Sequence, residues 1–373
     1  MQRVLHIIAH DVPYPLDYGG VFDLYCKLPA LQKQGIDIIY HCFDYGRGRQ
    51  PELNKYCREV YYYCRQEGHK GFSARQPYIV SSRTNEELFK NLLKDNHPIL
   101  AEGVHCTALM QQPLLAKRKI ILRLHNVEFE YYRQLYKHSK RPFKKAYYYH
   151  ESRLLKKYEE HLAHQLPVLA VAQKDVATYK KAFNAPHINY LPVFIPWQEV
   201  KAPEGMGNFC LYHGNLSIAE NEKAAIWLTE EVFKDLKIPF VIAGKNPGSR
   251  LEKLAHKQSH TCLVANPAED EMRDLVAKAQ VNILPSFNET GIKLKLLNAL
   301  FNGRHCIVNN AAVEQSGLAP ACHIAETATA LQHTITQLYH LPFGMEEKNI
   351  REKILLQQYN NAANASKLIA WIW

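Results

Sequence analysis

The stretch "LPSFNETGIKLKLLNALFNG", residues 284–303, runs from the end of a predicted buried strand into a predicted helix, and it puts two lysines in the first turns of that helix. We expect a strand over 281–286, a loop over 287–291 and a helix over 292–301. A helix N-terminus carries unpaired N–H groups and about half a unit of positive charge, so it attracts anions. The corner therefore indicates a bound diphosphate. A solvated lysine pair on an amphipathic helix is the alternative.

One face of the predicted helix is polar and the other is apolar. The polar residues Lys295, Asn298 and Asn302 share a face because their spacing is i, i+3, i+7. The apolar face consists of Leu296, Leu297, Leu300 and Phe301. Lys293 lies about 160° from Lys295 around the helix axis. We therefore expect only one of the two lysines to point into the anion site unless the backbone adjusts.

Outside this corner, short apolar runs rich in β-branched residues alternate with helical patterns, which is typical of parallel α/β sheets. Strands are predicted at 3–9, 36–43, 59–64, 98–103, 119–125, 167–172 and 188–193, and in a second series at 209–214, 239–244, 261–265, 281–286 and 305–310. The segment 192–208 has three prolines, two glycines and no periodicity, which indicates a linker. We predict an N-terminal domain at 1–195, a second domain at 196–350 and a final helical segment at 351–373.

Length and composition fit a two-domain globular protein. The chain has 373 residues, of which 47% are hydrophobic and 22% are charged. The nine cysteines include no C-x-x-C pair, and no segment approaches the roughly 20 apolar residues that span a bilayer. We expect reduced thiols and a cytoplasmic protein.

The positive charge is concentrated in the first half. The net charge is +10, and residues 1–195 contain 29 Lys and Arg against 18 Asp and Glu, which leaves 17 against 18 in the rest. Such a half could face nucleic acid, an anionic membrane or an acidic substrate, or it could simply be a solvated surface.

Further strand-to-helix corners could approach a phosphate. Gly19 and Gly20 lie between the first strand and its helix, although a tight turn explains a glycine pair equally well. Lys245 follows a strand in "VIAGKNPG" and offers a second cation. Ser217 with Glu220, and Thr84 with Glu87, have the spacing of capping boxes.

Together, the early "GG" loop with "LPALQKQGIDI", the segment "LHNVEFEYYRQL" at 124–135, "VIAGKNPG", and the 284–303 corner followed by "CIVNN" resemble the GT-B glycosyltransferases, specifically glycosyltransferase family 4 (glycosyl transferases group 1). The resemblance covers essentially the whole chain. It implies two Rossmann-like domains facing across a cleft, with the acceptor on the first, a nucleoside diphosphate sugar on the second, and a C-terminal helix that packs back on the first domain.

The resemblance also implies roles for individual residues. Those for the donor diphosphate are Gly19, Gly20, Lys245, Gly291, Ile292 and Lys295, and those for the nucleoside are Val264, Asn266, Pro267 and Asn298. The catalytic candidates are His125 near the donor sugar, Glu289 at the hydroxyls of the transferred sugar, and Lys295. His125 as a general base is a competing interpretation, but we favour sugar binding.

This chain departs from the family pattern at two positions. Asn298 stands where a glutamate usually contacts the ribose hydroxyls, and Asn215 stands where an arginine is common. Asparagine still donates and accepts hydrogen bonds, but it has no charge. The departures put donor affinity, nucleotide choice and activity itself in doubt.

The chemistry expected is transfer of a hexose-type sugar from a UDP- or GDP-sugar to a glycan or glycolipid, with retention of anomeric configuration. Cations and helix N–H groups would stabilise the departing diphosphate. No D-x-D pair occurs, and "EDE" at 269–271 is better explained as acids in the first turn of a helix. We therefore expect no metal ligands and no cofactor, with the nucleoside diphosphate sugar as a co-substrate.

The segment 137–157, "KHSKRPFKKAYYYHESRLLKK", mixes basic and aromatic residues and would suit peripheral contact with an anionic membrane. A solvated helix that lies against the domain core is the alternative. We expect no nucleic-acid partner.

Other functions predict different features. A dinucleotide-dependent oxidoreductase needs G-x-G-x-x-G after its first strand, and "AHDVPYPLDYGG" lacks that spacing. A GT-B nucleotide-sugar epimerase shares the donor site and stays open. So does a non-catalytic nucleotide-sugar-binding scaffold, which Asn298 and Asn215 favour.

Overall fold

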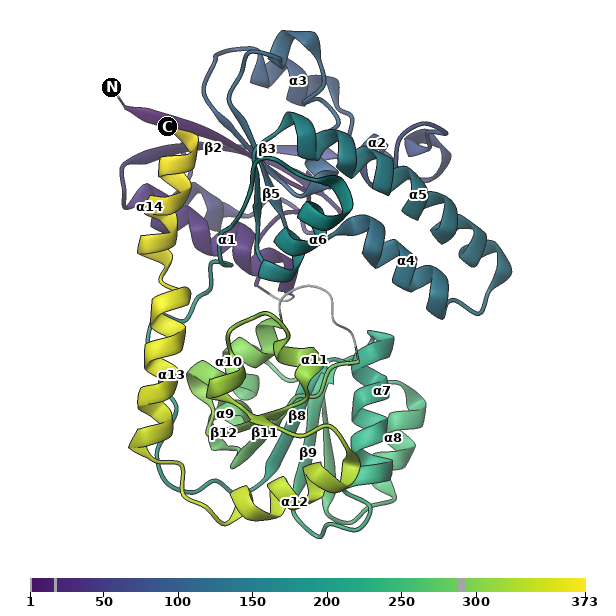
Figure 1. Cartoon of the computed structure of the whole chain (residues 1–373), viewed down its shortest axis with the longest axis vertical. Coiled ribbons are helices and arrows are strands. Elements are labelled where there is room, and N and C mark those ends of the chain that lie inside the picture. Colours follow the sequence, from purple (N-terminus) through teal and green to yellow (C-terminus); the bar gives the residue numbers. More distant parts are fainter. Residues whose placement is uncertain (1, 17–18, 288–292) are drawn as a thin grey trace. The chain divides into compact units, whose positions relative to one another are not determined.

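In the computed structural model, which describes residues 2–16, 19–287 and 293–373, the chain forms two compact units (Figure 1). Unit 1 comprises residues 1–196 and 359–373, and unit 2 comprises residues 197–358. The division follows Pro196, within the predicted linker. The C-terminal prediction needs a correction, because residues 351–358 belong to unit 2 and only 359–373 return to unit 1.

Unit 1 is built on a seven-stranded parallel sheet with the order β3-β2-β1-β4-β5-β6-β7. Its strands are β1 (Arg3–Ala9), β2 (Ile36–Asp44), β3 (Glu59–Cys64), β4 (Ile99–Glu102), β5 (Ile120–Leu124), β6 (Val168–Ala170) and β7 (Ile188–Tyr190). Its α-helices are α1 (Gly19–Gln32), α2 (Tyr78–Ser81), α3 (Glu86–Leu92), α4 (Glu128–His138), α5 (Pro142–Gln165), α6 (Gln173–Phe183) and α14 (Asn361–Ile372). The order reverses between β1 and β4.

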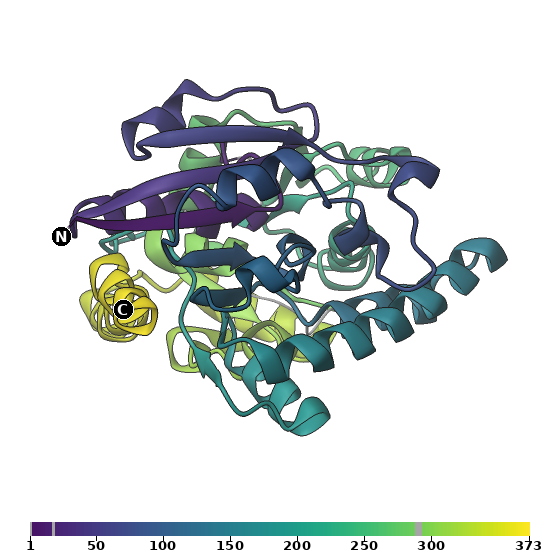
Figure 2. The ribbon, with the colours of Figure 1, turned by 90° about the horizontal axis from the view of Figure 1, so that it is seen from above.

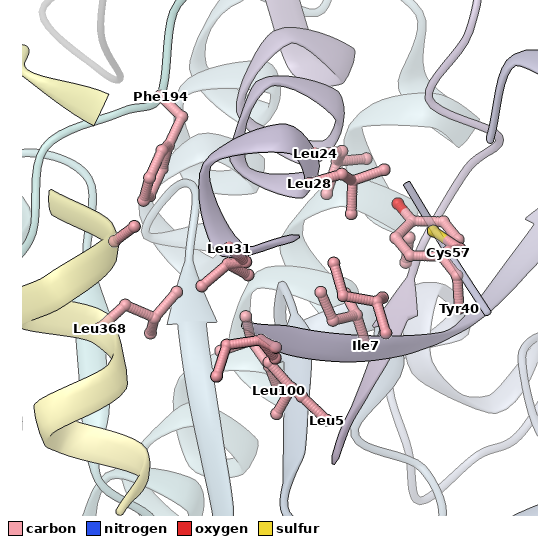
Figure 3. Packing of buried hydrophobic residues seen from close by; sticks show 14 of the residues in the cluster. Leu5, Ile7, Leu24, Leu28, Leu31, Tyr40, Cys57, Leu100, Phe194 and Leu368 are labelled. Atoms are coloured by element: carbon pink, nitrogen blue, oxygen red, sulfur yellow. The ribbon is translucent and has the colours of Figure 1, made fainter. Parts of the chain in front are cut away.

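Both faces of this sheet are covered, and for that reason its central strands read as nearly continuous apolar runs. Successive residues of β1 enter different clusters: Leu5 and Ile7 pack with α1 and α14, whereas Ile8 packs with α3. Figure 3 shows Leu368 of α14 beside Leu31 of α1, in the cluster that also contains Leu5 of β1. The last helix of the chain therefore completes the core of the first unit.

Unit 2 has a six-stranded parallel sheet with the order β10-β9-β8-β11-β12-β13. Its strands are β8 (Cys210–Asn215), β9 (Phe240–Lys245), β10 (Thr261–Ala265), β11 (Val281–Ile283), β12 (His305–Val308) and β13 (His323–Ile324). Its helices are α7 (Ala219–Trp227), extended by a π-helical turn (Leu228–Val232), α8 (Ser249–His256), α9 (Glu269–Lys278), α10 (Leu294–Asn302), α11 (Asn310–Val313), α12 (Ala328–Tyr339) and α13 (Met345–Gln358). The order reverses between β8 and β11.

Helix α13 explains why 351–358 stays with unit 2. Arg351 is fully buried, and its guanidinium donates to the carbonyl oxygens of Gly303 (2.6 Å) and Arg304 (2.5 Å) at the end of α10. Leu355, one turn later, is also buried. Because these groups are satisfied inside unit 2, the crossing to unit 1 begins only at Tyr359.

The described residues include no helix that is both long enough and apolar enough to cross a membrane. All nine cysteines are unpaired, as the absence of C-x-x-C spacing predicted.

Candidate active site

The position where strand order reverses is the first place to look for a ligand, because open parallel sheets bind ligands there, beyond the carboxyl ends of the strands. In unit 2 this position lies between β8 and β11. Helix α7 follows β8 and helix α10 follows β11, so Asn221 of α7 and Lys295 of α10 both belong to this position.

Lys295 is held there by two polar groups. Its ammonium donates to Asn221 Oδ1 (3.0 Å) and to the hydroxyl of Tyr212 (3.3 Å), and it lies 4.7 Å from the centre of the Tyr212 ring. The Tyr212 hydroxyl in turn donates to the Asn221 carbonyl (2.9 Å). Burial, with a smaller contribution from Lys293, lowers the pKa of Lys295 to about 7. Among the described residues no carboxylate pairs with Lys295, so a bound anion would favour its charged form.

Lys245 lies at the neighbouring strand end. It is the last residue of β9, its side chain is exposed, and it is in register with Asn215 of β8. Asn221 Nδ2 donates to the Asn215 carbonyl (2.9 Å). Asn221 therefore links Lys295, at the start of α10, to Asn215, the strand-end residue paired with Lys245.

Close backbone approach explains one glycine in this region. A Cβ at Gly244 would lie 1.9 Å from the Gly214 carbonyl oxygen of the adjacent strand. Any larger residue would therefore force β8 and β9 apart directly before Lys245.

The predicted nucleoside residues follow β10, the next strand. Val264 lies in β10, and Asn266 follows it with φ +53°. Asn266 donates its backbone N–H to the Gly244 carbonyl, and its Oδ1 accepts from the backbone N–H of Asn246, both at 2.8 Å. Asn266 thus stabilises the loops after β9 and β10, and Pro267 begins the approach to α9. Contact with a base stays a prediction.

The polar face of α10 has the expected composition. Leu296, Leu297, Leu300 and Phe301 are all buried, as their spacing predicted. Asn298 Oδ1 accepts from Asn302 Nδ2 at 2.8 Å, so two of the three polar residues bind each other. The predicted residues Glu289, Gly291 and Ile292 lie outside the described residues.

Asn309 was not predicted as a site residue, but it fixes the backbone at this corner. Its Oδ1 accepts from the backbone N–H of Ser286 (2.9 Å), and its Nδ2 donates to the Ser286 carbonyl (2.8 Å). The side chain thereby joins the segment after β12 to the segment after β11. The "CIVNN" motif was the available signal, since an asparagine directly after a buried strand favours such backbone contacts.

In unit 1 the order of strands reverses between β1 and β4, and His125 lies close by, directly after β5. Its Nε2 is 2.7 Å from Glu102 Oε2 at the end of β4 and 3.9 Å from Asp23 Oδ2 of α1. Gly19 and Gly20 form the first turn of α1, one turn before Asp23. The structure thus brings His125 and the glycine pair to one end of the sheet.

A buried ion network supports His125. Lys27 contacts both Asp23 (2.8 Å) and Glu102, and Arg123 lies 3.0 Å from Asp23 Oδ1. Burial alone would raise the pKa of Asp23, but Arg123 and Lys27 hold that pKa well below its ordinary value. Asp23, Glu102 and His125 are close enough to form a metal site. Because two fixed cations already neutralise the two carboxylates, we interpret the group as an ion-pair network.

Two further histidines lie beside His125. The ring centre of His10 is 5.1 Å from that of His105 and 5.7 Å from that of His125. Burial lowers the pKa of His10 to about 3 and that of His105 well below its ordinary value. Sequence reasoning missed both residues and the ion network, although each histidine, and Glu102 and Arg123, stand out as polar residues in or directly after apolar strands.

Comparison with known proteins gives one family match, within unit 2, and one relative over most of the chain. Residues 207–340 match the family model described as "Glycosyl transferases group 1". A Klebsiella pneumoniae protein named "Uncharacterized 44.6 kDa protein in cps region" is 25% identical over 335 residues, covering 85% of each chain.

Two solved structures show the same fold over nearly the full length. Sucrose-phosphate synthase from Thermosynechococcus elongatus is 14% identical with a TM-score of 0.71, over 99% of this chain and 98% of that one. S. aureus TarM, in complex with Fondaparinux, alpha-GlcNAc-glycerol and UDP, is 10% identical with a TM-score of 0.69, over 99% of each chain. The expected fold of two parallel α/β domains is confirmed, and unit 2 contains a domain that matches the glycosyl transferases group 1 model, which supports glycosyltransferase activity.

Proposed function

We propose that this protein is a GT-B glycosyltransferase that transfers a hexose-type sugar from a UDP- or GDP-sugar to a glycan or glycolipid acceptor. The observation that carries the proposal is Lys295, a lysine held at the strand-order reversal of unit 2 by Tyr212 and Asn221 with no described carboxylate partner. The S. aureus TarM structure, which contains UDP and Fondaparinux, supports this combination of donor and acceptor.

The diphosphate of the donor occupies the strand ends of unit 2. As the bond between the anomeric carbon and the phosphate breaks, the leaving diphosphate gains negative charge. Lys295 and Lys245 stabilise that charge, assisted by the N-terminus of α10. Two lysines supply the positive charge that a divalent cation provides elsewhere, so the proposed reaction needs neither a metal nor another cofactor. Gly291, Ile292 and Glu289 keep their proposed roles at the diphosphate and the transferred sugar.

His125 binds the reacting sugar in this proposal. Glu102 accepts from its Nε2, which fixes the Nε2–H tautomer and directs the ring. Because Nε2 donates to Glu102, His125 is better suited to orienting a sugar hydroxyl than to acting as a general base. The departing phosphate instead takes the proton of the acceptor hydroxyl as the new glycosidic bond forms. This route retains the anomeric configuration.

A nucleotide screen tests the donor proposal. Thermal shifts with UDP, GDP, ADP and CMP should show stabilisation by one nucleoside diphosphate, since a ligand that binds only the folded state raises its stability. Turnover with the matching sugars should release free nucleotide without added metal and in the presence of EDTA. Stabilisation without turnover would favour a binding scaffold, and interconverted free sugar would favour an epimerase. No stabilisation by any nucleotide would refute the donor site.

We also propose that the hairpin of α4 and α5 rests on an anionic membrane, which would bring a lipid-linked acceptor to a cytoplasmic enzyme. Phe143 at its tip is 91% exposed, and Tyr149 is 48% exposed. Figure 2 shows the hairpin extending away from the sheet of unit 1. The basic residues of this surface are Lys137, Lys140, Arg141, Lys144, Lys145 and Arg153.

Flotation with vesicles of anionic and of zwitterionic lipid tests this surface. The wild-type chain should float with anionic vesicles only, and K140E/R141E/K144E/K145E should remain at the bottom of the gradient. A control charge reversal at exposed lysines of unit 2, K234E/K237E, should leave flotation unchanged. Equal behaviour of both variants would remove the membrane from the proposal.

A further inference from the structure

A second group of side chains that could bind a metal ion lies in unit 2. It lies where the strands of the sheet begin, whereas Lys245 and Asn309 lie where the strands end. His305 and His323 are the first residues of the neighbouring strands β12 and β13, and Glu347 lies in the first turn of α13. One ligand atom from each of the three residues lies within 4.8 Å of the others. None of the three has a place in the proposed glycosyl transfer.

Both ring nitrogens of His305 lie near an oxygen atom that accepts hydrogen bonds. Its ring is buried, and Nε2 is 2.9 Å from the Leu341 carbonyl oxygen. A carbonyl oxygen only accepts, so Nε2 carries a hydrogen and Nδ1 presents either a lone pair or a second proton. Nδ1 lies 2.8 Å from Glu347 Oε2. A lone pair would repel that carboxylate oxygen, so either a proton or a metal ion lies between the two atoms.

His323 directs a second ring nitrogen at the same carboxylate. Its Nε2 is 3.2 Å from Glu347 Oε1, and its side chain is 36% exposed. A metal-binding histidine commonly donates from its other ring nitrogen to a backbone carbonyl, as His305 Nε2 donates to Leu341. Two imidazole nitrogens and one carboxylate are a ligand set that Zn²⁺ prefers.

We propose that His305 Nδ1, His323 Nε2 and Glu347 bind one Zn²⁺ ion, with water in the fourth position on the exposed side of His323. Tetrahedral Zn²⁺ with ligands at about 2.0–2.1 Å holds them about 3.3 Å apart. The contact between His305 Nδ1 and Glu347 Oε2 therefore opens by about 0.5 Å on binding, which a rotation of the glutamate side chain provides.

Arg351 acts as an outer partner of this site. Its Nη2 is 3.4 Å from Glu347 Oε1, while Nη1 and Nη2 donate to the carbonyls of Gly303 and Arg304. The guanidinium is thus held by the end of α10, and it contacts Oε1 of the Glu347 carboxylate, whereas His305 contacts Oε2. The ion would join β13, a two-residue edge strand, to β12 and α13, which gives it a structural role.

Cobalt titration of the full chain tests the site. After dialysis against a chelator, the wild-type chain should take up one equivalent of Co²⁺ with visible ligand-field absorption, and Zn²⁺ should displace it. His323→Ala should weaken binding by at least about 100-fold, since loss even of an outer partner of a metal ligand costs about 10–100-fold. His333→Ala, at an exposed histidine of α12, is the matched control and should bind as wild type.

Because His323 is partly exposed, its variant should fold, and circular dichroism with the nucleotide thermal shift checks this. Nucleotide stabilisation should be the same in His323→Ala and wild type, so failure of the metal site is distinguishable from failure of the donor site. Two outcomes overturn the proposal. One is the absence of saturable Co²⁺ uptake by the wild-type chain, which would mean that a proton and not a metal ion lies between His305 Nδ1 and Glu347 Oε2. The other is equal Co²⁺ affinity of His323→Ala and wild type.

Discussion

At the scale of single residues, two kinds of side chain define the donor end of unit 2. Lys295 provides charge, and Gly244 provides space. Lys295 is unusual because its contacts are an amide oxygen, a hydroxyl and an aromatic ring in place of a carboxylate. Gly244 is required because the Gly214 carbonyl occupies the position of any side chain.

Replacing Lys295 by glutamine should remove the cation while keeping a hydrogen-bond donor near Asn221. We expect turnover of the sugar donor to fall about 10²–10³-fold, the range seen when one preorganised group that stabilises developing negative charge is lost. Steady-state kinetics measure this, with Lys278→Gln, an exposed lysine of α9, as the control that should keep wild-type activity. Equal rates for the two variants would contradict the assignment.

Replacing Gly244 by alanine should force β8 and β9 apart. Overpacking of this kind typically costs about 1–3 kcal/mol of unfolding free energy. Urea denaturation followed by circular dichroism gives the value. Gly344→Ala is the control, because no atom lies within 4 Å of its added Cβ and its stability should be close to wild type. A wild-type midpoint for Gly244→Ala would show that the strands adjust freely.

At the scale of elements, hydrogen bonds near the strand ends and loops determine where helices α3 and α7 begin. The capping boxes predicted at Ser217 and Thr84 are wrong: α7 begins after Ile218 and α3 begins after Asn85, whose Oδ1 accepts from the Leu88 N–H. Ser217 instead donates its hydroxyl to Asn215 Oδ1 (2.7 Å). A residue beside a strand end has competing partners there, and the sequence spacing does not reveal them.

Helix α14 shows that an element can complete a core far from its place in the chain. Leu368 is fully buried against α1 and β1. Leu368→Ala should therefore lower the stability of unit 1 by about 2–5 kcal/mol. Hydrogen exchange read by mass spectrometry should increase in α1 and β1 and stay unchanged in unit 2. Lys367→Ala, the exposed neighbour, should exchange as wild type, and unchanged exchange in both would place the helix outside the core.

At the scale of the whole molecule, buried neutral histidines couple folding to pH. Burial lowers the pKa values of His10 in unit 1 and His213 in unit 2 from 6.5 to about 3. The unfolded chain binds protons at these residues below pH 6.5, whereas the folded chain does so only near pH 3. Their stabilisation is therefore complete above pH 6.5 and is lost as the pH falls toward 3.

Between the folded and unfolded pKa values, each of these histidines lowers the free energy of unfolding by about 1.4 kcal/mol for every pH unit of acidification. Chemical denaturation of the full chain at pH 5, 6 and 7 should show that the free energy of unfolding of unit 2 declines as the pH falls. His213→Gln should reduce the slope of this free energy against pH by the equivalent of about one proton. His333→Ala should leave the slope as in wild type. An equal slope in His213→Gln would show that His213 titrates alike in both states.

Local sequence patterns were enough to predict two parallel α/β units, the buried face of α10, the strand ends at Lys245 and His125, and the helix start that carries Lys295. Periodicity and strand-to-helix order are local properties, and a parallel sheet collects its strand ends at one edge, so these assignments needed no knowledge of distant contacts. The roles of Asn221, Asn309, Glu102 and the histidines beside His125, and the transfer of 351–358 to unit 2, depended on the tertiary structure. Each is decided by hydrogen bonds between segments far apart in the chain, for which no local pattern exists.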